Sequence, residues 1–493
     1  MGRLATALWC AIAGCLLCVV AGCEKDSGLE AAAEPQPPGP TPNIVFVMID
    51  TLRADSMGIY FNNEGHTPNQ DALALEGVTF ERAITQAPWT QPAIASLFCS
   101  RYPGVHKVLD YATAFRATHE GQPKVAVFDE SFPTIAEALR ERGYVTAGFV
   151  ANPYIVEEFG FAQGFDHFDT SFANNLTPGN VVNDAAFAWL RQRDPNKPFF
   201  VYLHYMDCHG PYDAGPEFLD PLLARVEQMP RKRVLNDREF KELNYLKNQL
   251  PTVHDNPDLH RRLFRFQEYW AARYNAGVRQ MDYYIGQLRA GLTEMGLWDD
   301  AYVMLTADHG EALCEHGLWE HGWSTHHTDL HVPLILRWPG VLPAGKRVLQ
   351  TIRLIDVLPT LVEQLRLPTP PGMQGASLSP YIAGRPPSNP VIAFAEGVKL
   401  GGEQKAVYVG DWKLIKFVTS NTVQLYNIAQ DPLEQNNLAG QQQIRVRNLL
   451  TILESQVSLN ARLAAGFEAE QVPLSPERRR QLEILGYLQG SSP

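Results

Sequence analysis

Residues 43–50 read NIVFVMID, a continuous apolar run that ends in the carboxylate of Asp50. A run of this kind, without polar alternation, is typical of a strand that is buried on both faces within a parallel sheet. Similar runs cover residues 144–150, 198–204 and 302–307, and residues 133–142 have the pattern of a helix that ends at the following glycine. Strands that alternate with helices predict an α/β fold, a doubly wound sheet with helices on both faces.

Three chemically active side chains lie at or shortly after the ends of these strands. Asp50 follows the first strand, His209 lies a few residues beyond the strand at 198–204, and Asp308 follows the strand at 302–307. Ligands of doubly wound sheets bind beyond the carboxyl ends of the strands. We therefore expect the functional site at this edge of the sheet.

The rest of the chain divides by composition. Residues 43–384 form the expected catalytic domain, within which the polar, helix-prone stretch 213–280 is expected to be a helical insertion over the site. Residues 385–440 contain short β-type runs separated by turns, which predict a smaller C-terminal subdomain with an antiparallel sheet. Residues 441–493 are expected to form a helical, amphipathic tail that packs back on the body.

The N-terminal segment has the features of an export signal. After Arg3, an apolar run over residues 4–20 ends in small residues that lead into Cys23. This arrangement resembles a bacterial lipoprotein signal over residues 1–23, with Cys23 as the lipidated residue. The Pro-rich stretch 24–42 would then tether an exported, membrane-anchored protein on the periplasmic side or the cell surface. An uncleaved transmembrane anchor is the alternative.

Charge and cysteine content narrow the class of protein. The 493-residue chain has a formal net charge of -12, and its 42 Lys and Arg residues are scattered, so we expect no nucleic-acid partner. Outside the signal segment there are three cysteines, Cys99, Cys208 and Cys314. They are too few for a disulfide framework, although one pair could form in an oxidising compartment.

Residues 306–311, TADHGE, place a carboxylate and an imidazole side by side after a buried strand. Asp308 and His309 offer the oxygen and nitrogen ligands that suit a divalent cation. The local sequence alone leaves an alternative, in which Asp308 caps a following helix and His309 is a polar loop residue. The other motifs of the chain favour the metal site.

Five blocks stand in order along the chain: residues 42–60 (PNIVFVMIDTLRADSMGIY), 67–80 (TPNQDALALEGVTF), 101–105 (RYPGV), 306–322 and 425–438 (LYNIAQDPLEQNNL). Together they resemble the sulfatase family of the alkaline phosphatase superfamily, and several ordered motifs are far more specific than one. The resemblance implies an alkaline phosphatase-like fold and a metal-dependent ester hydrolase.

The resemblance also implies roles for single residues. Asp50, Asp308 and His309 would bind one divalent metal ion, which is Ca²⁺, Mg²⁺ or Mn²⁺, with Zn²⁺ as a further option. The nucleophile would be Thr90. A typical sulfatase has Cys or Ser there, followed by x-Pro-x-Arg, and converts it to formylglycine. Here Pro92 is kept, but the modifiable residue and the Arg are not.

The change to threonine affects the expected chemistry. The superfamily's phosphodiesterases, nucleotide pyrophosphatases and phosphoglycerol or phosphoethanolamine transferases are similar in using threonine against a metal, which suits phosphoryl chemistry. Pro92 favours a helix that begins at Thr90, where the positive helix terminus stabilises an alkoxide and an incoming anion. A simple helix cap is the alternative role for Thr90. Cys99 fails as another formylglycine site because of its spacing, and we expect it to be a buried helix residue.

Three more residues are assigned from the family's blocks. His209, in the block 204–212 (HYMDCHGPY), matches a substrate-binding histidine, and His321 falls where related hydrolases often carry a lysine that protonates the leaving oxygen. Asn152 resembles a weaker substrate contact, although a turn explains it equally well. For both histidines an ordinary loop role is the alternative, and a second metal held by His209, His321 and Asp207 is another.

These assignments predict a metal-dependent hydrolase of sulfate or phosphate esters that acts through Thr90. Its substrate would be a small molecule, a glycan or a lipid headgroup that carries such an ester. One alternative is transfer to an alcohol acceptor, which the missing multi-helix membrane domain of such transferases disfavours. Another is a non-catalytic lipoprotein that binds sulfated or phosphorylated glycans, which the retained metal ligands disfavour.

Overall fold

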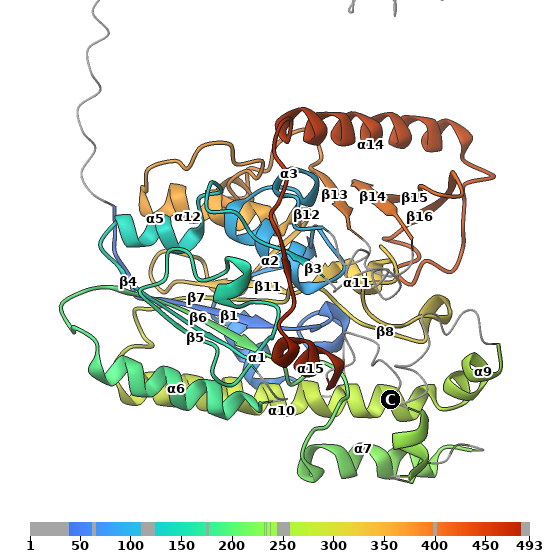
Figure 1. Ribbon diagram of the computed structural model, residues 1–493, viewed down its shortest axis with the longest axis horizontal. Coiled ribbons are helices and arrows are strands. Elements are labelled where there is room, and N and C mark those ends of the chain that lie inside the picture. Colours follow the sequence, from blue (N-terminus) through green and yellow to red (C-terminus); the bar gives the residue numbers. More distant parts are fainter. Residues whose placement is uncertain are drawn as a thin grey trace, which may run out of the picture. The chain divides into compact units, whose positions relative to one another are not determined.

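The computed structural model describes residues 39–484, except for 62–65, 110–123, 174–176, 231, 233, 237, 244–256 and 398–401 (Figure 1). The expected signal over residues 1–23, with Cys23, and most of the tether lie outside the described residues. In the part of the chain that is described, no helix combines the length and the apolar character needed to cross a membrane.

Strand β1 (Ile44–Ile49) lies inside the main sheet and pairs in parallel with β6 (Phe199–Tyr205) and β7 (Tyr302–Thr306). None of its six residues is more than 1% exposed. Because neighbouring strands cover both edges and helices cover both faces, every position of β1 must be apolar. The register places Met48 beside His204 of β6 and Thr306 of β7, so the carboxyl ends of the three strands meet.

The described strands of the main sheet follow the order β10-β2-β11-β7-β1-β6-β4-β5, with β12 paired to β2. The neighbouring strands β7, β1, β6, β4 and β5 pair in parallel. Strand β11 runs antiparallel to both β7 and β2. The remaining strands are β2 (Val78–Ile84), β4 (Val145–Val150), β5 (His167–Asp169), β10 (His331–Val332), β11 (Leu334–Arg337) and β12 (Lys346–Arg353). The predicted α/β sheet is confirmed, as a mixed rather than a wholly parallel one.

Helices cover the sheet on both faces (Figure 1). On one face α6 contacts β4 and β6 and packs on α10, and on the other face α5 contacts β4 while α2 packs between α5 and α12. The helices are α1 (Pro68–Leu75), α2 (Thr90–Cys99), α3 (Pro103–His106), α5 (Ile135–Glu141), α6 (Gly179–Gln192), α7 (Pro216–Gln228), α9 (Pro257–Arg265), α10 (Gln267–Glu294), α11 (His327–Leu330), α12 (Val357–Leu365), α13 (Ser379–Ile382), α14 (Gln443–Leu463) and α15 (Pro476–Ile484).

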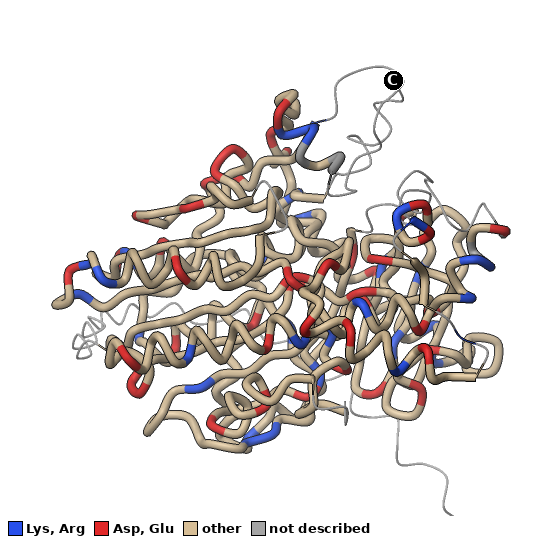
Figure 2. Tube along the Cα trace, turned by 90° about the horizontal axis from the view of Figure 1, so that it is seen from below, with Lys and Arg blue, Asp and Glu red and all other residues tan. Residues whose placement is uncertain are grey.

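The predicted insertion at 213–280 contributes α7, α9 and the first half of α10. Helix α10 continues to Glu294 and packs against α1, α6 and α7, so it belongs to the body as much as to the insertion. Within the insertion, Lys232 forms an ion pair with Glu268 at 2.7 Å. Along the described chain as a whole, acidic and basic residues are interspersed (Figure 2).

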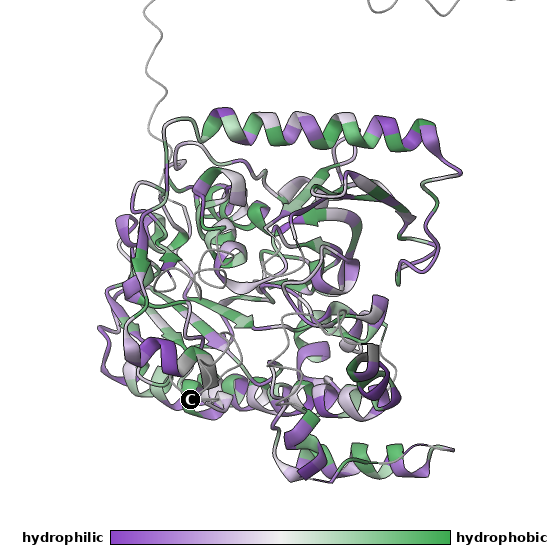
Figure 3. Cartoon of the chain, turned by 45° about the vertical axis from the view of Figure 1, so that its right-hand side comes forward, coloured by the Kyte–Doolittle hydropathy of each residue, from purple (hydrophilic) through white to green (hydrophobic). Residues whose placement is uncertain are grey.

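A smaller antiparallel sheet follows the body, as predicted. Its strands are β13 (Ile392–Glu396), β14 (Gln404–Val409), β15 (Trp412–Phe417) and β16 (Thr422–Asn427), paired in chain order. Helix α14 alternates polar and apolar residues (Figure 3) and buries Leu449 and Leu453 against Val407 and Leu414 of this sheet.

The tail was predicted to be helical over residues 441–493, but in the described residues it is only partly so. Strand β17 (Gln471–Pro473) separates α14 from α15 and pairs antiparallel with β3 (Lys124–Ala126). This pairing supplies main-chain partners that amphipathic periodicity could not predict, because β3 lies more than 300 residues earlier in the chain.

Thr134 caps helix α5, and this cap gives a test of the local structure. Thr134 Oγ1 accepts a hydrogen bond from Glu137 N at 3.2 Å, and Glu137 Oε2 accepts one from Thr134 N at 2.8 Å. Thr134→Ala is expected to lower the free energy of unfolding by about 1 kcal/mol, measured by chemical denaturation. Thr134→Ser, which keeps the cap, is the control. An alanine variant as stable as the parent would contradict the expectation.

Candidate active site

Asp50, Asp308 and His309 come together at the carboxyl ends of β1 and β7. Asp50 directly follows β1, and Asp308 and His309 follow β7 by two and three residues. His309 Nε2 lies 3.3 Å from Asp308 Oδ2 and 3.8 Å from Asp50 Oδ1, and all three residues are 0% exposed. The structure therefore brings the three predicted metal ligands into one cluster.

His204, at the end of β6, belongs to the same cluster and was not among the predicted site residues. Its Nε2 lies 3.1 Å from Asp50 Oδ2, and its Nδ1 lies 3.0 Å from the Tyr202 hydroxyl. The possible ligand atoms of Asp50, His204 and Asp308 lie within 4.8 Å of one another. The signal in the sequence was a histidine inside the otherwise apolar and aromatic strand FFVYLHY.

The two carboxylates are buried with oxygens that accept no hydrogen bond from the described residues, namely Asp50 Oδ1 and Asp308 Oδ2. Burial and the nearby charge of Asp50 raise the pKa of Asp308 well above its usual value. Burial acts in the same direction on Asp50, but the hydrogen bond from His204 and the charges of His209 and His309 hold the pKa of Asp50 well below its usual range. Two buried carboxylates beside histidine nitrogens fit a divalent cation, which compensates both charges.

A strained turn places these groups. Thr51 has φ +59°, a conformation that a β-branched residue rarely adopts. Its N–H donates to Asp308 Oδ1 at 3.3 Å, and its carbonyl accepts a hydrogen bond from the Tyr274 hydroxyl at 2.9 Å. Helix α10 therefore holds the turn that joins Asp50 to Asp308, and such over-determined strain is frequent at functional sites.

Thr90 is the first residue of α2 and lies against this cluster. Its Oγ1 is 3.3 Å from His309 Nε2, and it is 1% exposed. The preceding Trp89 is extended and donates its indole N–H to Gly397 O at 2.7 Å, which fixes the chain where the helix begins. The hydroxyl thus lies at the positive end of a helix, as the Thr-x-Pro pattern predicts.

Asn152 also reaches the cluster. Its Nδ2 donates to Asp50 Oδ2 at 2.7 Å and lies 3.5 Å from Thr90 Oγ1, while its Oδ1 accepts from Tyr154 N at 2.8 Å. The structure therefore gives Asn152 a part in orienting the Asp50 carboxylate. A contact with substrate stays a prediction.

His209 and His321 lie next to each other beyond His309. The ring centroids of His209 and His321 are 5.0 Å apart, and those of His309 and His321 are 4.4 Å apart. Burial lowers the pKa of His209 despite the nearby charge of Asp50. His321 Nδ1 lies 3.1 Å from Glu311 Oε1, a partner that was not predicted. This contact orients the His321 ring through Nδ1.

Asp207 does not join His209 and His321, which removes the alternative second metal site. Its Oδ1 accepts hydrogen bonds from Gln280 Nε2 at 2.8 Å and from Gly179 N at 3.3 Å. Asp207 therefore connects α6 and α10 instead of facing the histidines.

Arg53 fastens the loop that follows β7. It forms a two-contact ion pair with Asp55 at 2.8 and 2.7 Å, and its Nη1 donates to Glu311 O and to Glu315 Oε1 at 2.9 and 2.8 Å. Gly310 lies under this contact, where a Cβ atom would come within 1.9 Å of Thr328 O. The loop can therefore pack this closely against Thr328 only because residue 310 is glycine, which has no Cβ atom.

The cysteines do not contribute to the site. Cys99, Cys208 and Cys314 are buried free thiols, so the disulfide pair considered above does not form. Cys99 ends α2, and burial raises the pKa of its thiol to about 12, as expected for a buried helix residue.

Comparisons with known proteins point to one family. The family model described as Sulfatase matches residues 42–367, and the model described as N-sulphoglucosamine sulphohydrolase, C-terminal, matches residues 314–460. The arylsulfatase of Clostridium perfringens is 23% identical over 82% of this chain and 92% of its own length. The N-acetylglucosamine-6-O-sulfatase of Bacteroides thetaiotaomicron is 24% identical over 84% of this chain and 86% of its own length.

Solved structures share the fold. A protein in complex with its substrate D-glucosamine-2-N,6-O-disulfate superimposes with a TM-score of 0.69 at 21% identity, covering 85% of this chain and 98% of its own. The phosphonate monoester hydrolase of Agrobacterium radiobacter gives a TM-score of 0.65 at 22% identity, covering 88% and 100%. The alkaline phosphatase-like fold implied by the sequence blocks is thereby confirmed.

The buried carboxylates give a direct test of metal binding. Asp308→Asn keeps the shape of the side chain and removes its charge, so it is expected to abolish retention of the metal ion at this cluster while the protein stays folded. Metal content after dialysis and circular dichroism are the measurements. Asp207→Asn is the matched control, because Asp207 is a partly buried aspartate two residues beyond β6 that contacts α6 and α10. Undiminished metal content in Asp308→Asn would remove the site from these residues.

Proposed function

The chain belongs to the sulfatase family and is a sulfatase-like ester hydrolase, and we propose that it cleaves sulfate or phosphate esters with Thr90 as the nucleophile. The observation that carries this proposal is the position of the Thr90 hydroxyl. Thr90 is the first residue of helix α2, and its hydroxyl lies 3.3 Å from His309 Nε2, next to the buried carboxylate cluster.

In the proposed reaction, Thr90 Oγ1 attacks the sulfur or phosphorus atom in line with the ester oxygen. The Thr90 hydroxyl loses its proton to water, a bond from Oγ1 to that atom forms as the bond to the ester oxygen breaks, and the leaving alcohol takes up a proton from a histidine. The N-terminus of α2 stabilises both the deprotonated hydroxyl and the charge on the equatorial oxygens. Water then breaks the threonine ester by attack at sulfur or phosphorus.

We assign the proton donor to His321 or His209. Glu311 contacts the ring of His321 through Nδ1, and we assign the proton transfer to Nε2. Burial lowers the pKa of His209, and a neutral ring there would favour a role in positioning the anionic ester rather than in donating a proton. The geometry therefore favours His321 as the general acid.

The proposal includes one divalent cation held by Asp50, Asp308 and His309, with His204 as a further candidate ligand. When bound, such a cation neutralises the carboxylate pair and polarises an oxygen of the ester. Carboxylate oxygens favour Ca²⁺, Mg²⁺ or Mn²⁺, whereas the histidines also admit Zn²⁺. Asn152 would keep Asp50 oriented toward this cation through its 2.7 Å hydrogen bond.

Two properties of the relatives bear on the substrate. One relative is an N-acetylglucosamine-6-O-sulfatase, and one structural neighbour holds a disulfated glucosamine, which supports a sulfated sugar as the substrate class. Another neighbour is a phosphonate monoester hydrolase, which supports phosphoryl chemistry on the same fold. Transfer to an alcohol acceptor instead of water is the second candidate reaction, because it needs the same threonine intermediate.

Replacing Thr90 tests the nucleophile. Thr90→Val keeps the shape and removes the oxygen, so turnover is expected to fall on the order of a thousandfold or more, about 4 kcal/mol at the transition state. Turnover is measured on aryl sulfate, phosphate monoester, phosphodiester and phosphonate substrates. Metal content should be largely unchanged, because the aspartates and His309 supply the ligands.

Thr90→Ser is the matched control, since it keeps a hydroxyl at the start of α2 and should retain most of the activity. Rapid quenching of the wild type is expected to trap a phospho- or sulfothreonine at residue 90 without any aldehyde there. A valine variant with a near-normal rate would rule out the mechanism. A phosphodiester rate well below the sulfate rate would contradict the link between threonine and phosphoryl chemistry.

We also propose that the protein is an exported lipoprotein anchored through Cys23, on the strength of the sequence of residues 1–23. Cys23→Ala is expected to release the protein from the membrane fraction or to block its processing. Cell fractionation and the mass of the mature N-terminus are the measurements. Unchanged fractionation and mass would favour a transmembrane anchor.

A further inference from the structure

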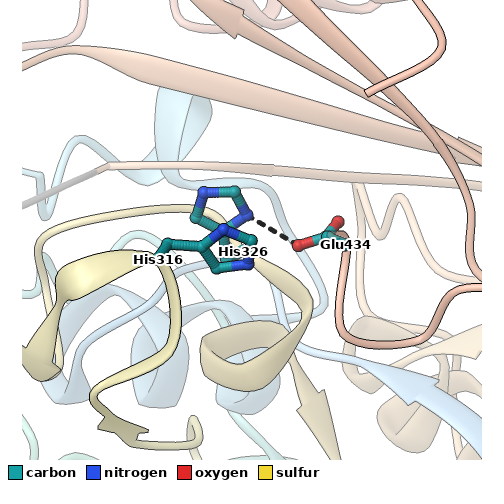
Figure 4. Close-up of side chains that lie close together, drawn as sticks. All are labelled: His316, His326 and Glu434. Atoms are coloured by element: carbon teal, nitrogen blue, oxygen red, sulfur yellow. Dashed lines mark hydrogen bonds and ion pairs between the residues drawn. The ribbon is translucent and has the colours of Figure 1, made fainter. Parts of the chain in front are cut away.

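A second group of potential metal ligands lies outside the proposed active site (Figure 4). His316 lies in the short 3₁₀ turn Glu315–Gly317, His326 immediately precedes α11, and Glu434 follows β16 in the C-terminal subdomain. The three residues therefore come from separate segments, two in the body and one in the subdomain.

Their side chains lie close together. His326 Nδ1 lies 2.7 Å from Glu434 Oε2, and the rings of His316 and His326 stack with centroids 3.6 Å apart and planes 4° apart. A ligand atom from each of the three residues lies within 4.8 Å of the other two. His326 and Glu434 are buried, at 5% and 2% exposure, whereas His316 is open to solvent.

The two oxygens of Glu434 have different surroundings. Oε1 lies 2.6 Å from the buried Lys413 Nζ, which compensates the charge on that side. Oε2 faces the imidazoles and accepts a hydrogen bond from His327 N at 2.8 Å. Lys413 thus orients the carboxylate through Oε1, while Oε2 lies beside the histidines. A carboxylate held in this way has the surroundings of a metal ligand.

The state of the imidazoles is compatible with ligation. A neutral imidazole carries one nitrogen lone pair, the form in which histidine binds a metal. Two stacked rings that share one carboxylate would repel each other if both were protonated.

We propose that His316, His326 and Glu434 bind a divalent transition metal ion of the Zn²⁺ class at a site separate from the Asp50 and Asp308 cluster. Two histidines and one glutamate form a ligand set typical of Zn²⁺, with the solvent side at His316 left for water. Binding replaces the proton shared by His326 Nδ1 and Glu434 Oε2, and that proton is released to solvent.

The bound ion would join the body to the C-terminal subdomain. His316 and His326 flank the segment that carries His321, the proposed general acid, while Glu434 belongs to the turn after β16. The site therefore crosslinks the loop of the proposed acid to a neighbouring sheet. The inference about metal binding does not depend on the reaction, because it rests only on these three side chains and their contacts.

The test is a titration of the full chain with Zn²⁺. The protein is stripped with a chelator and saturated with Ca²⁺, and Zn²⁺ binding is then followed by calorimetry and by the thermal midpoint. One Zn²⁺ site per chain is expected, with a rise in the midpoint. His316→Asn should weaken binding at least tenfold and remove the rise, since Asn tolerates the φ of +54° at this position and lacks the imidazole.

Three further variants complete the test. His167→Asn removes another exposed histidine, on the edge strand β5, and should bind Zn²⁺ as the wild type does. His326→Gln should weaken binding as His316→Asn does. Asp308→Asn should keep this Zn²⁺ site, and a loss of it there would show that the ion occupies the carboxylate cluster instead. A wild type without Zn²⁺ binding, or a His316→Asn protein of unchanged affinity, would overturn the proposal.

Discussion

The arrangement of the site depends on two carboxylates that are brought together inside the protein. Parallel neighbours β1 and β7 end at the same edge of the sheet, so Asp50 and Asp308 meet without exposure to water. Two buried like charges are unfavourable unless they are compensated. The surrounding histidines, Asn152 and the N–H of Thr51 all act on this pair, and the strained turn at Thr51 shows that the fold holds the pair together at a conformational cost.

Much of this arrangement could be predicted because it is encoded locally. The apolar run of β1 predicts a buried central strand, and a buried strand that ends in Asp50 predicts where that side chain lies. The same argument applies to Asp308 after β7, and the Thr-x-Pro pattern predicts a helix that begins at Thr90. Each inference needs only the periodicity of one segment and the rule that ligands bind at the carboxyl ends of strands.

The partners of these residues could not be predicted, since each comes from a distant part of the chain. Tyr274 on α10 holds the turn at Thr51, and Arg53 holds the loop after β7 through Glu311 and Glu315. Nothing in a helix pattern indicates which residue points at a turn more than 200 positions away. His204 is the intermediate case: a histidine in an apolar strand is visible in the sequence, but its contact with Asp50 depends on the register of β6 against β1.

The proposed role of Thr90 requires a different second step from that of the formylglycine that the family usually has at this position. A formylglycine hydrate expels sulfate by collapsing to an aldehyde, so its release step does not require water to attack a crowded centre. A threonine ester has no such route, and hydrolysis must bring water to sulfur or phosphorus on the side opposite Oγ1. In the proposed mechanism His321, which Glu311 contacts through Nδ1, protonates the leaving alcohol and then activates the water by the reverse proton transfer. In the proposed mechanism a threonine at residue 90 therefore requires more of His321 than formylglycine would, and the contact of His321 with the buried Glu311 agrees with that requirement.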